Sequence, residues 1–147
     1  MFGIIWILII IIFLIIKEYR ECGIQLINTL IFCGIIGNLI LKPIFKRNRP
    51  FSINPIIELI IAAPNDFSFP SGHTMVSFAS SYIIYKFNKK LGICSYILSL
   101  LIGISRMYLY VHYPTDVIAG AIIGILIGIL ANKIYEYICN KQKKEQM

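Results

Sequence analysis

Long apolar runs alternate with short polar segments along this chain. Phe2–Ile16 is an unbroken apolar run, and Cys22–Leu41 is a second run without any charge. Three further apolar runs cover about Ser71–Tyr85, Leu91–Ser105 and Asp116–Tyr137. An α-helix crosses the hydrocarbon core of a bilayer with about 20 apolar residues, and somewhat shorter spans occur. The pattern therefore predicts an all-α, polytopic bundle of five membrane-spanning helices.

The segments between these runs are polar or too short to span a bilayer. Phe51–Phe69 carries the apolar stretch Ile56–Ala63, which predicts a loop or a helix lying in the membrane interface. Asn140–Met147 predicts a frayed polar tail. The first run has no basic segment before it and no small-residue cleavage site, so we expect a retained span and not a signal peptide.

Composition supports a single integral-membrane domain over residues 1–147. Hydrophobic residues make up 58% of the chain and charged residues 14%, with a mean hydropathy of +0.78. Soluble domains carry about a quarter charged residues, and disordered chains need low hydrophobicity, so both classes are excluded. The net charge of +7 fits the positive-inside rule or an anion site better than nucleic-acid binding.

The basic residues divide unequally between the two membrane faces that five spans imply. One face receives nine of them and the other five, and the positive-inside rule places the larger group in the cytoplasm together with the C-terminus. We therefore expect a multi-pass protein of the plasma membrane. The cytoplasmic group is Lys17, Arg20, Lys86, Lys89, Lys90, Lys133, Lys141, Lys143 and Lys144. The exoplasmic group is Lys42, Lys46, Arg47, Arg49 and Arg106.

Two sets of small residues have mainly structural interpretations. The cysteines are scattered through apolar runs without metal-binding spacing, so they predict neither a zinc site nor a disulfide. They are Cys22, Cys33, Cys94 and Cys139. The last span carries a GxxxGxxxG face formed by Gly120, Gly124 and Gly128. This face predicts close helix packing within the chain, with a homodimer seam as the alternative.

Three polar motifs fall on the exoplasmic face, although they are far apart in sequence. They are Lys42-x6-Arg49-Pro50, Pro70-Ser71-Gly72-His73 and Ser105-Arg106-x5-His112-x3-Asp116. Ionisable groups at membrane depth are energetically costly, so a cluster of them indicates a functional site.

The residue types in these motifs favour an anion with several oxygens. Lys42 offers a point charge, and Arg49 and Arg106 offer planar forks suited to phosphate. Ser71 is a natural N-cap for the third span, and Gly72 allows the backbone to approach a ligand closely. Free N–H groups at that helix start would add to anion binding. The sequence therefore predicts a phosphate site.

Two histidines accompany this site. A carboxylate from Asp116 can hold one ring nitrogen of His112 and leave the other free to attack phosphorus. His73 has no partner nearby in sequence, which suits a general acid. The acidic residues on this face, Glu58, Asp66 and Asp116, are too few and scattered for a magnesium site, so we expect catalysis without metal or other cofactor. Glu58 and Asp66 receive no role.

Other residues on the same face have simpler interpretations. Lys46 and Arg47 predict contacts with anionic lipid, as juxtamembrane basic clusters commonly make. Tyr108, Tyr110 and Tyr113 predict an aromatic belt at the membrane surface.

The three motifs together resemble the signature of the type 2 phosphatidic acid phosphatase (PAP2) superfamily. All eleven signature positions match in order and spacing, and the resemblance covers about residues 41–131. It implies a helical bundle whose site lies at the exoplasmic surface. It also implies that His112 forms a phosphohistidine, Asp116 orients His112, and His73 protonates the leaving group. The positions that would hold phosphate are Lys42, Arg49, Ser71, Gly72 and Arg106. Membrane members usually have six spans, whereas this pattern predicts five.

The resemblance favours a lipid phosphatase of the bacterial type. Undecaprenyl or another polyprenyl diphosphate is the preferred substrate, because a chain of 147 residues has little extramembrane structure for reading a headgroup. Phosphatidylglycerophosphate or phosphatidate is the alternative. A non-catalytic protein that binds lipid phosphate is the alternative from a different class. Related haloperoxidases are soluble, which this composition excludes.

Overall fold

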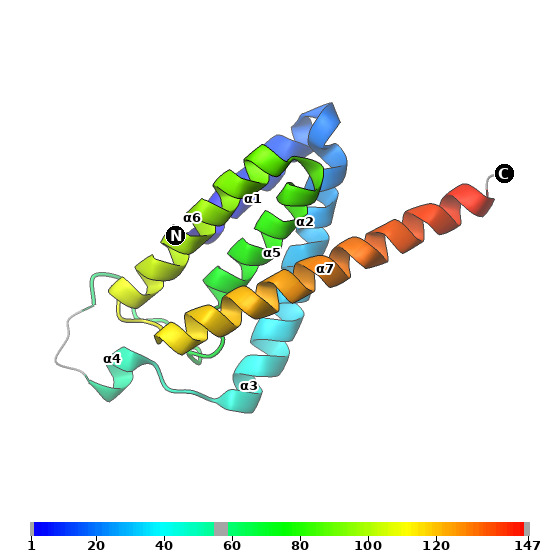
Figure 1. Ribbon diagram of the computed structural model, residues 1–147. Helices are drawn as coiled ribbons and strands as arrows, with labels where there is room; N and C mark the ends of the chain where they lie inside the picture. Colours follow the sequence, from blue (N-terminus) through cyan, green and yellow to red (C-terminus); the bar gives the residue numbers. More distant parts are fainter. Residues whose placement is uncertain (1, 55–58, 146–147) are drawn as a thin grey trace.

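The chain folds into a bundle of helices, with one long helix reaching beyond the others (Figure 1). The computed structural model describes residues 2–54 and 59–145, and within these ranges the regular structure is entirely helical. Its elements are α1 (Phe2–Ile15), the 3₁₀ turn η1 (Lys17–Tyr19), α2 (Arg20–Cys33), the π-helix η2 (Gly34–Leu41), α3 (Lys42–Phe45), α4 (Pro50–Ile53), α5 (Gly72–Phe87), α6 (Lys89–Tyr108) and α7 (Pro114–Glu145).

Each of the five predicted apolar runs forms a helix, and the all-α class is confirmed. The second run is longer than predicted, because α2, η2 and α3 continue one another from Arg20 to Phe45. In the described part of the chain, three segments are long and apolar enough to cross a membrane: Lys17–Ile53, Lys89–Tyr108 and Pro114–Gln142. Helices α1 and α5 are shorter, with 14 and 16 residues. The count of five spans therefore stays a prediction.

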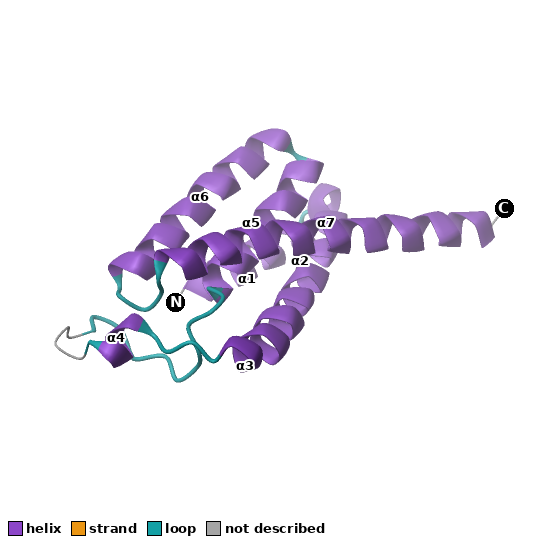
Figure 2. Ribbon diagram, turned by 60° about the horizontal axis from the view of Figure 1, so that its bottom comes forward, coloured by secondary structure: helices purple, strands orange, loops and turns teal. Residues whose placement is uncertain are grey.

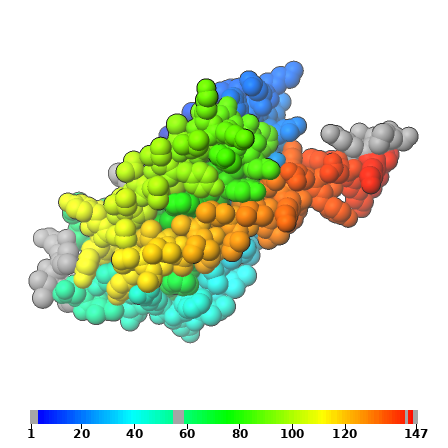
Figure 3. Space-filling model, in the orientation of Figure 1, coloured from blue at the N-terminus to red at the C-terminus, as the bar shows by residue number. Residues whose placement is uncertain are grey.

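The prediction of a frayed C-terminal tail is wrong over its described part. Helix α7 continues to Glu145 and projects past the bundle (Figures 1 and 3). Lysine, glutamine and glutamate are good helix formers. In addition, Lys141 Nζ lies 3.9 Å from Glu145 Oε1 in an i,i+4 ion pair. Polar composition in this segment favours an exposed helix as much as a loop.

Helix α5 occupies the centre of the bundle. It packs along α7, α6 and α2, and Figure 2 shows these helices gathered around it. Its apolar core includes the fully buried Ile83, which packs with Trp6 of α1, Leu26 of α2 and Ile102 of α6. This arrangement fixes α5 between the other helices.

The glycine face of α7 lies against α5. A Cβ atom at Gly124 would come within 2.3 Å of the Met75 carbonyl oxygen, and one at Gly120 within 2.7 Å of the Ser71 carbonyl oxygen. At Gly128 the nearest atom, the Ala79 carbonyl oxygen, would be 3.0 Å away. The face is therefore used for packing within the chain. A homodimer seam through the same glycines stays a prediction.

Between α4 and α5, the described residues 54 and 59–71 form no further helix. The predicted interfacial stretch Ile56–Ala63 is loop over residues 59–63, and its first part lies outside the described residues together with Glu58. Residues 64–71 then lead to α5 across the ends of α3, α6 and α7 (Figure 2).

Candidate active site

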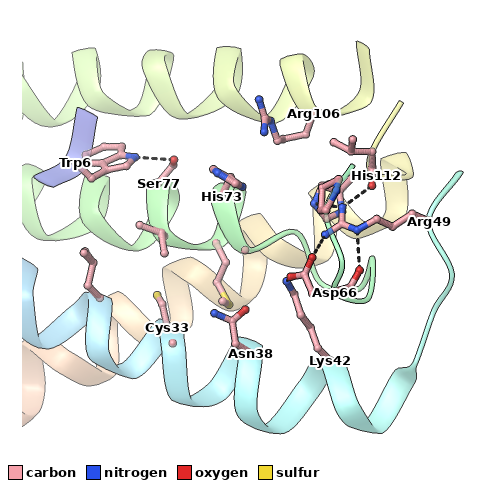
Figure 4. Close-up of a pocket in the computed structure, with 17 residues that line it drawn as sticks. Trp6, Cys33, Asn38, Lys42, Arg49, Asp66, His73, Ser77, Arg106 and His112 are labelled. Carbon is pink, nitrogen blue, oxygen red and sulfur yellow. Dashed lines mark hydrogen bonds and ion pairs between the residues drawn. The ribbon is translucent and has the colours of Figure 1, made fainter. Parts of the chain in front are cut away.

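The three motifs meet at a cavity of about 380 Å³ at this end of the bundle. Figure 4 shows the cavity between η2, α5 and α6. Six of the eight residues predicted for the site line it: Lys42, Arg49, Gly72, His73, Arg106 and His112. The other two, Ser71 and Asp116, are fully buried.

The basic residues reach the cavity from three elements. Lys42 follows the π-helix η2 and Arg49 precedes α4, and both side chains are buried. Arg106 extends from the last turn of α6. Arg49 donates hydrogen bonds from Nη1 to the Val111 carbonyl oxygen at 2.8 Å and from Nε to the Asp66 carbonyl oxygen at 2.8 Å. Buried guanidinium and ammonium groups at one cavity create a strong site for an anion.

The start of α5 differs in one detail from the prediction. Ser71 occupies the N-cap position, but its hydroxyl contacts Thr74 Oγ1 at 2.9 Å and makes no capping bond to the backbone. Its backbone N–H donates to the Asp116 carbonyl oxygen at 3.1 Å. A Cβ atom at Gly72 would make ordinary contacts with Asn38 Oδ1, at 3.8 Å, and with Lys42 Nζ, at 4.0 Å. Ser71 therefore joins α5 to α7, while Gly72 faces the cavity.

His112 and Asp116 are close, and a serine stands between them. The distance from His112 Nδ1 to Asp116 Oδ2 is 3.6 Å, too long for a direct hydrogen bond. Ser68 Oγ donates to Asp116 Oδ2 at 2.5 Å and lies 3.4 Å from His112 Nδ1. Ser68 is fully buried. It connects the carboxylate to the imidazole, a role for which the sequence offered no spacing signal.

Asp116 also binds Arg47, and this corrects the lipid-contact interpretation of that residue. Arg47 Nη1 donates to Asp116 Oδ1 and to Thr115 Oγ1, both at 2.7 Å. Its guanidinium lies 4.0 Å from the ring centroid of Tyr113, so Tyr113 is a stacking partner and not merely part of a surface belt. By contrast, Tyr108 is 81% exposed, and its place in an aromatic belt stays a prediction.

His112 Nε2 faces the basic residues. It lies 3.3 Å from Arg49 Nη1 inside a buried environment. Burial lowers the pKa of His112, Asp116 raises it, and the Arg49 charge lowers it again, leaving the pKa below its ordinary value. A neutral imidazole with a lone pair on Nε2 is the form that can act as a nucleophile.

Asp66, which had no predicted role, contacts the two cations at the cavity mouth. Its carboxylate forms ion pairs with Lys42 Nζ and with Arg49 Nη2, the latter at 2.5 Å. Burial works against ionisation of Asp66, but hydrogen bonds and charge from Lys42 and Arg49 outweigh it and hold its pKa below the usual range. The carboxylate is therefore charged at neutral pH.

The cavity continues from the cations toward an apolar end. There Trp6, Leu30, Cys33 and Val76 line it, and Trp6 Nε1 donates to Ser77 Oγ at 2.8 Å. Figure 4 shows Trp6 and Ser77 at the end opposite the cations. Within residues 2–54 and 59–145, no three His, Cys, Asp or Glu side chains are grouped to hold a metal ion.

Comparison with known proteins decides the family. The PAP2 superfamily model matches residues 23–139. The chain belongs to this family. It is 34% identical over 132 residues to a protein from Sulfolobus acidocaldarius named undecaprenyl-diphosphatase, a match that covers 88% of this chain and 63% of that protein. This PAP2 chain spans 52% to 65% of the length of the first curated relatives that it matches.

Two solved PAP2 structures have the same arrangement of helices. LpxE from Aquifex aeolicus superposes with a TM-score of 0.76 at 29% identity, covering 89% of this chain and 78% of that one. A transmembrane PAP2-type phosphatidylglycerolphosphate phosphatase from Bacillus subtilis gives a TM-score of 0.69 at 26% identity, covering 91% and 68%. The apolar helices and these relatives identify the chain as a membrane protein.

Proposed function

We propose that this PAP2 protein is a phosphatase that hydrolyses a lipid phosphate or diphosphate. The observation that carries the proposal is one cavity with a cationic end, at Lys42 and Arg49, and an apolar end, at Trp6 and Leu30. Such a cavity matches a phosphate joined to a hydrocarbon chain, because cations favour the anion while apolar walls favour the chain.

Phosphate transfer would proceed in two steps through His112. Nε2 attacks phosphorus and forms an N–P bond while the bond from phosphorus to the leaving oxygen breaks, and His73 gives its proton to that oxygen. Water then attacks the phosphohistidine, gives its proton to His73, and breaks the N–P bond to release phosphate. Lys42, Arg49, Arg106 and the backbone N–H groups at the start of α5 would stabilise the phosphoryl oxygens.

Asp116 would support the imidazolium that develops on His112 during attack. Its carboxylate is fully buried and acts through the intervening Ser68 hydroxyl. A fixed negative charge beside a developing positive one lowers the barrier without reorganisation of solvent.

Polyprenyl diphosphate, with undecaprenyl diphosphate first, is the proposed substrate. The relative named undecaprenyl-diphosphatase supports it. Phosphatidylglycerophosphate is the second candidate, because one structural neighbour is named a phosphatidylglycerolphosphate phosphatase. The test compares phosphate release from these lipids and from phosphatidate by purified protein in EDTA, with His112→Ala as the inactive control. Lipid binding without release by the wild type would favour the non-catalytic alternative and refute the proposal.

We further propose that the site faces the exterior of the plasma membrane and that the C-terminus is cytoplasmic. The nine-to-five division of basic residues supports this orientation. The exposed Asn65 and Lys89 can be changed separately to cysteine in a Cys94→Ser background. An impermeant thiol reagent applied to intact cells should label Asn65→Cys alone. Labelling of Lys89→Cys alone would reverse the proposed orientation.

A further inference from the structure

The carboxylate of Asp66 forms ion pairs with Lys42 and Arg49, two of the residues proposed to bind the substrate phosphate. Its two oxygens pair with different cations, Oδ2 with Lys42 Nζ and Oδ1 with Arg49 Nη2. The Lys42 and Arg49 side chains are 8% and 5% exposed, whereas that of Asp66 is 51% exposed. Two buried cations thus share one anion, which stands at the solvent-facing edge of the cavity and offsets one of their two charges.

This contact has the chemistry of a bound phosphate. Carboxylate and phosphate both present anionic oxygens that accept charge-assisted hydrogen bonds from guanidinium and ammonium groups. Asp66 lines the same cavity as Gly72, His73 and His112. An incoming phosphate that binds Lys42 and Arg49 in this cavity therefore meets the Asp66 carboxylate on the same donors.

The chain segment that carries Asp66 is anchored on both sides of the contact. Arg49 Nε holds the Asp66 carbonyl oxygen at 2.8 Å, and the Ser68 N–H donates to the Arg47 carbonyl oxygen at 2.8 Å. The backbone can therefore stay in place while the Asp66 side chain rotates away. Its half-exposed position gives the displaced carboxylate access to water, which solvates its charge.

We propose that Asp66 is a built-in competitor of the substrate phosphate. Its carboxylate pairs with Lys42 and Arg49 when no ligand is bound, and it leaves these donors when phosphate enters. The inference rests on the proposed function in taking phosphate as the ligand. The apparent Kd of a site is its intrinsic Kd divided by the fraction of time for which the site is available. A carboxylate present about nine-tenths of the time therefore raises the Kd about tenfold.

The experiment measures binding of inorganic phosphate without turnover. Radiolabelled phosphate is equilibrated with the purified full-length protein by dialysis at neutral pH, for the wild type and for Asp66→Asn. Asparagine keeps the shape of the side chain and removes its charge. Glu18→Gln is the matched control, because it removes one exposed carboxylate between α1 and α2, away from the cavity. Lipid hydrolysis is assayed separately on the same samples.

We expect Asp66→Asn to bind phosphate about tenfold more tightly than the wild type, with Glu18→Gln unchanged. Equal or weaker binding in Asp66→Asn would overturn the proposal, since Asp66 would then merely orient the cations. If Asp66→Asn binds phosphate more tightly but the wild type does not hydrolyse lipid, the proposed role of Asp66 is supported and the proposed function is refuted. Asp66→Asn and Asp66→Ala could fold only when phosphate is added during purification. This result would support the proposal, because phosphate would then take the place of the carboxylate beside Lys42 and Arg49. Failure to fold with and without phosphate would assign Asp66 a purely structural role.

Discussion

Replacing Ser68 with alanine tests how His112 is held for attack. The change removes a hydroxyl that donates to Asp116 Oδ2 at 2.5 Å and lies 3.4 Å from His112 Nδ1. Asp116 keeps two other donors, Arg47 Nη1 at 2.7 Å and the Tyr113 N–H at 3.0 Å. The carboxylate therefore stays charged and in place, while its link to the imidazole is lost across the remaining 3.6 Å.

The expected magnitude follows from the kind of bond removed. A hydrogen bond to a charged group contributes about 1.5–3 kcal/mol, and the remaining donors to Asp116 favour the lower end of this range. If about 1.4 kcal/mol of that is expressed in the transition state, kcat falls about tenfold. KM should stay nearly constant, because Ser68 is fully buried and the contacts proposed for phosphate are unchanged.

The assay combines steady-state kinetics with a rapid quench of the acid-labile phosphoenzyme. In Ser68→Ala, phosphohistidine should form about tenfold more slowly than in the wild type. Ser99→Ala is the control, because Ser99 is equally buried and its hydroxyl contacts Ser81 Oγ at 2.8 Å, within the bundle and outside the site. It should lower Tm without changing kcat. A kcat for Ser68→Ala within twofold of the wild type, or a loss confined to KM, would refute the reasoning.

Further predictions concern the histidines, an arginine and the glycine face. A nitrophenyl phosphate, with its good leaving group, should partly rescue His73→Ala and leave His112→Ala inactive; rescue of the second variant would exchange their roles. Because the pKa of His112 is lowered, His112 stays unprotonated, and kcat/KM should hold as pH falls through about 6.5, where an unperturbed histidine would already lose activity. Arg106→Lys should lower kcat about 10²-fold, and near-normal rates would limit Arg106 to packing. Gly124→Ala, whose Cβ would come within 2.3 Å of a carbonyl oxygen, should destabilise the fold by about 1–3 kcal/mol, whereas Gly34→Ala, with open space, should leave Tm equal or higher.

The helices and the meeting of the three motifs could be predicted from the sequence for physical reasons. Membrane spans leave a simple record, because nearly every residue between two polar segments must be apolar. Once the spans are counted, topology alone brings Lys42, Gly72 and His112 to one face. The helix ends were less accessible: α6 begins at Lys89, two residues before the predicted span, and ends at Tyr108, three residues after it. Polar residues can extend a membrane helix into water, as the described part of the tail also does.

The contacts that Ser68, Arg47 and Asp66 make in the site could not be predicted from the sequence. Ser68 reaches Asp116 across 48 positions of sequence, and Arg47 reaches it across 69. Both residues, like Asp66, come from irregular segments that have no periodicity to predict the direction of a side chain. Arg47 was assigned to lipid because it stands in a basic cluster, and only the fold shows that its charge is satisfied by a buried carboxylate.

The glycine face of α7 connects this packing to the proposed chemistry. Gly120 lies one turn after Asp116, and the absence of its side chain lets the Ser71 carbonyl approach α7 closely. At the same place the Ser71 N–H donates to the Asp116 carbonyl oxygen at 3.1 Å. The first turn of α5, which carries His73, is thereby fixed against the first turn of α7, which carries the carboxylate beside His112. The small residues of this face, for which the sequence predicted close helix packing, thus set the spacing between the proposed acid, His73, and the carboxylate of Asp116, which supports the proposed nucleophile.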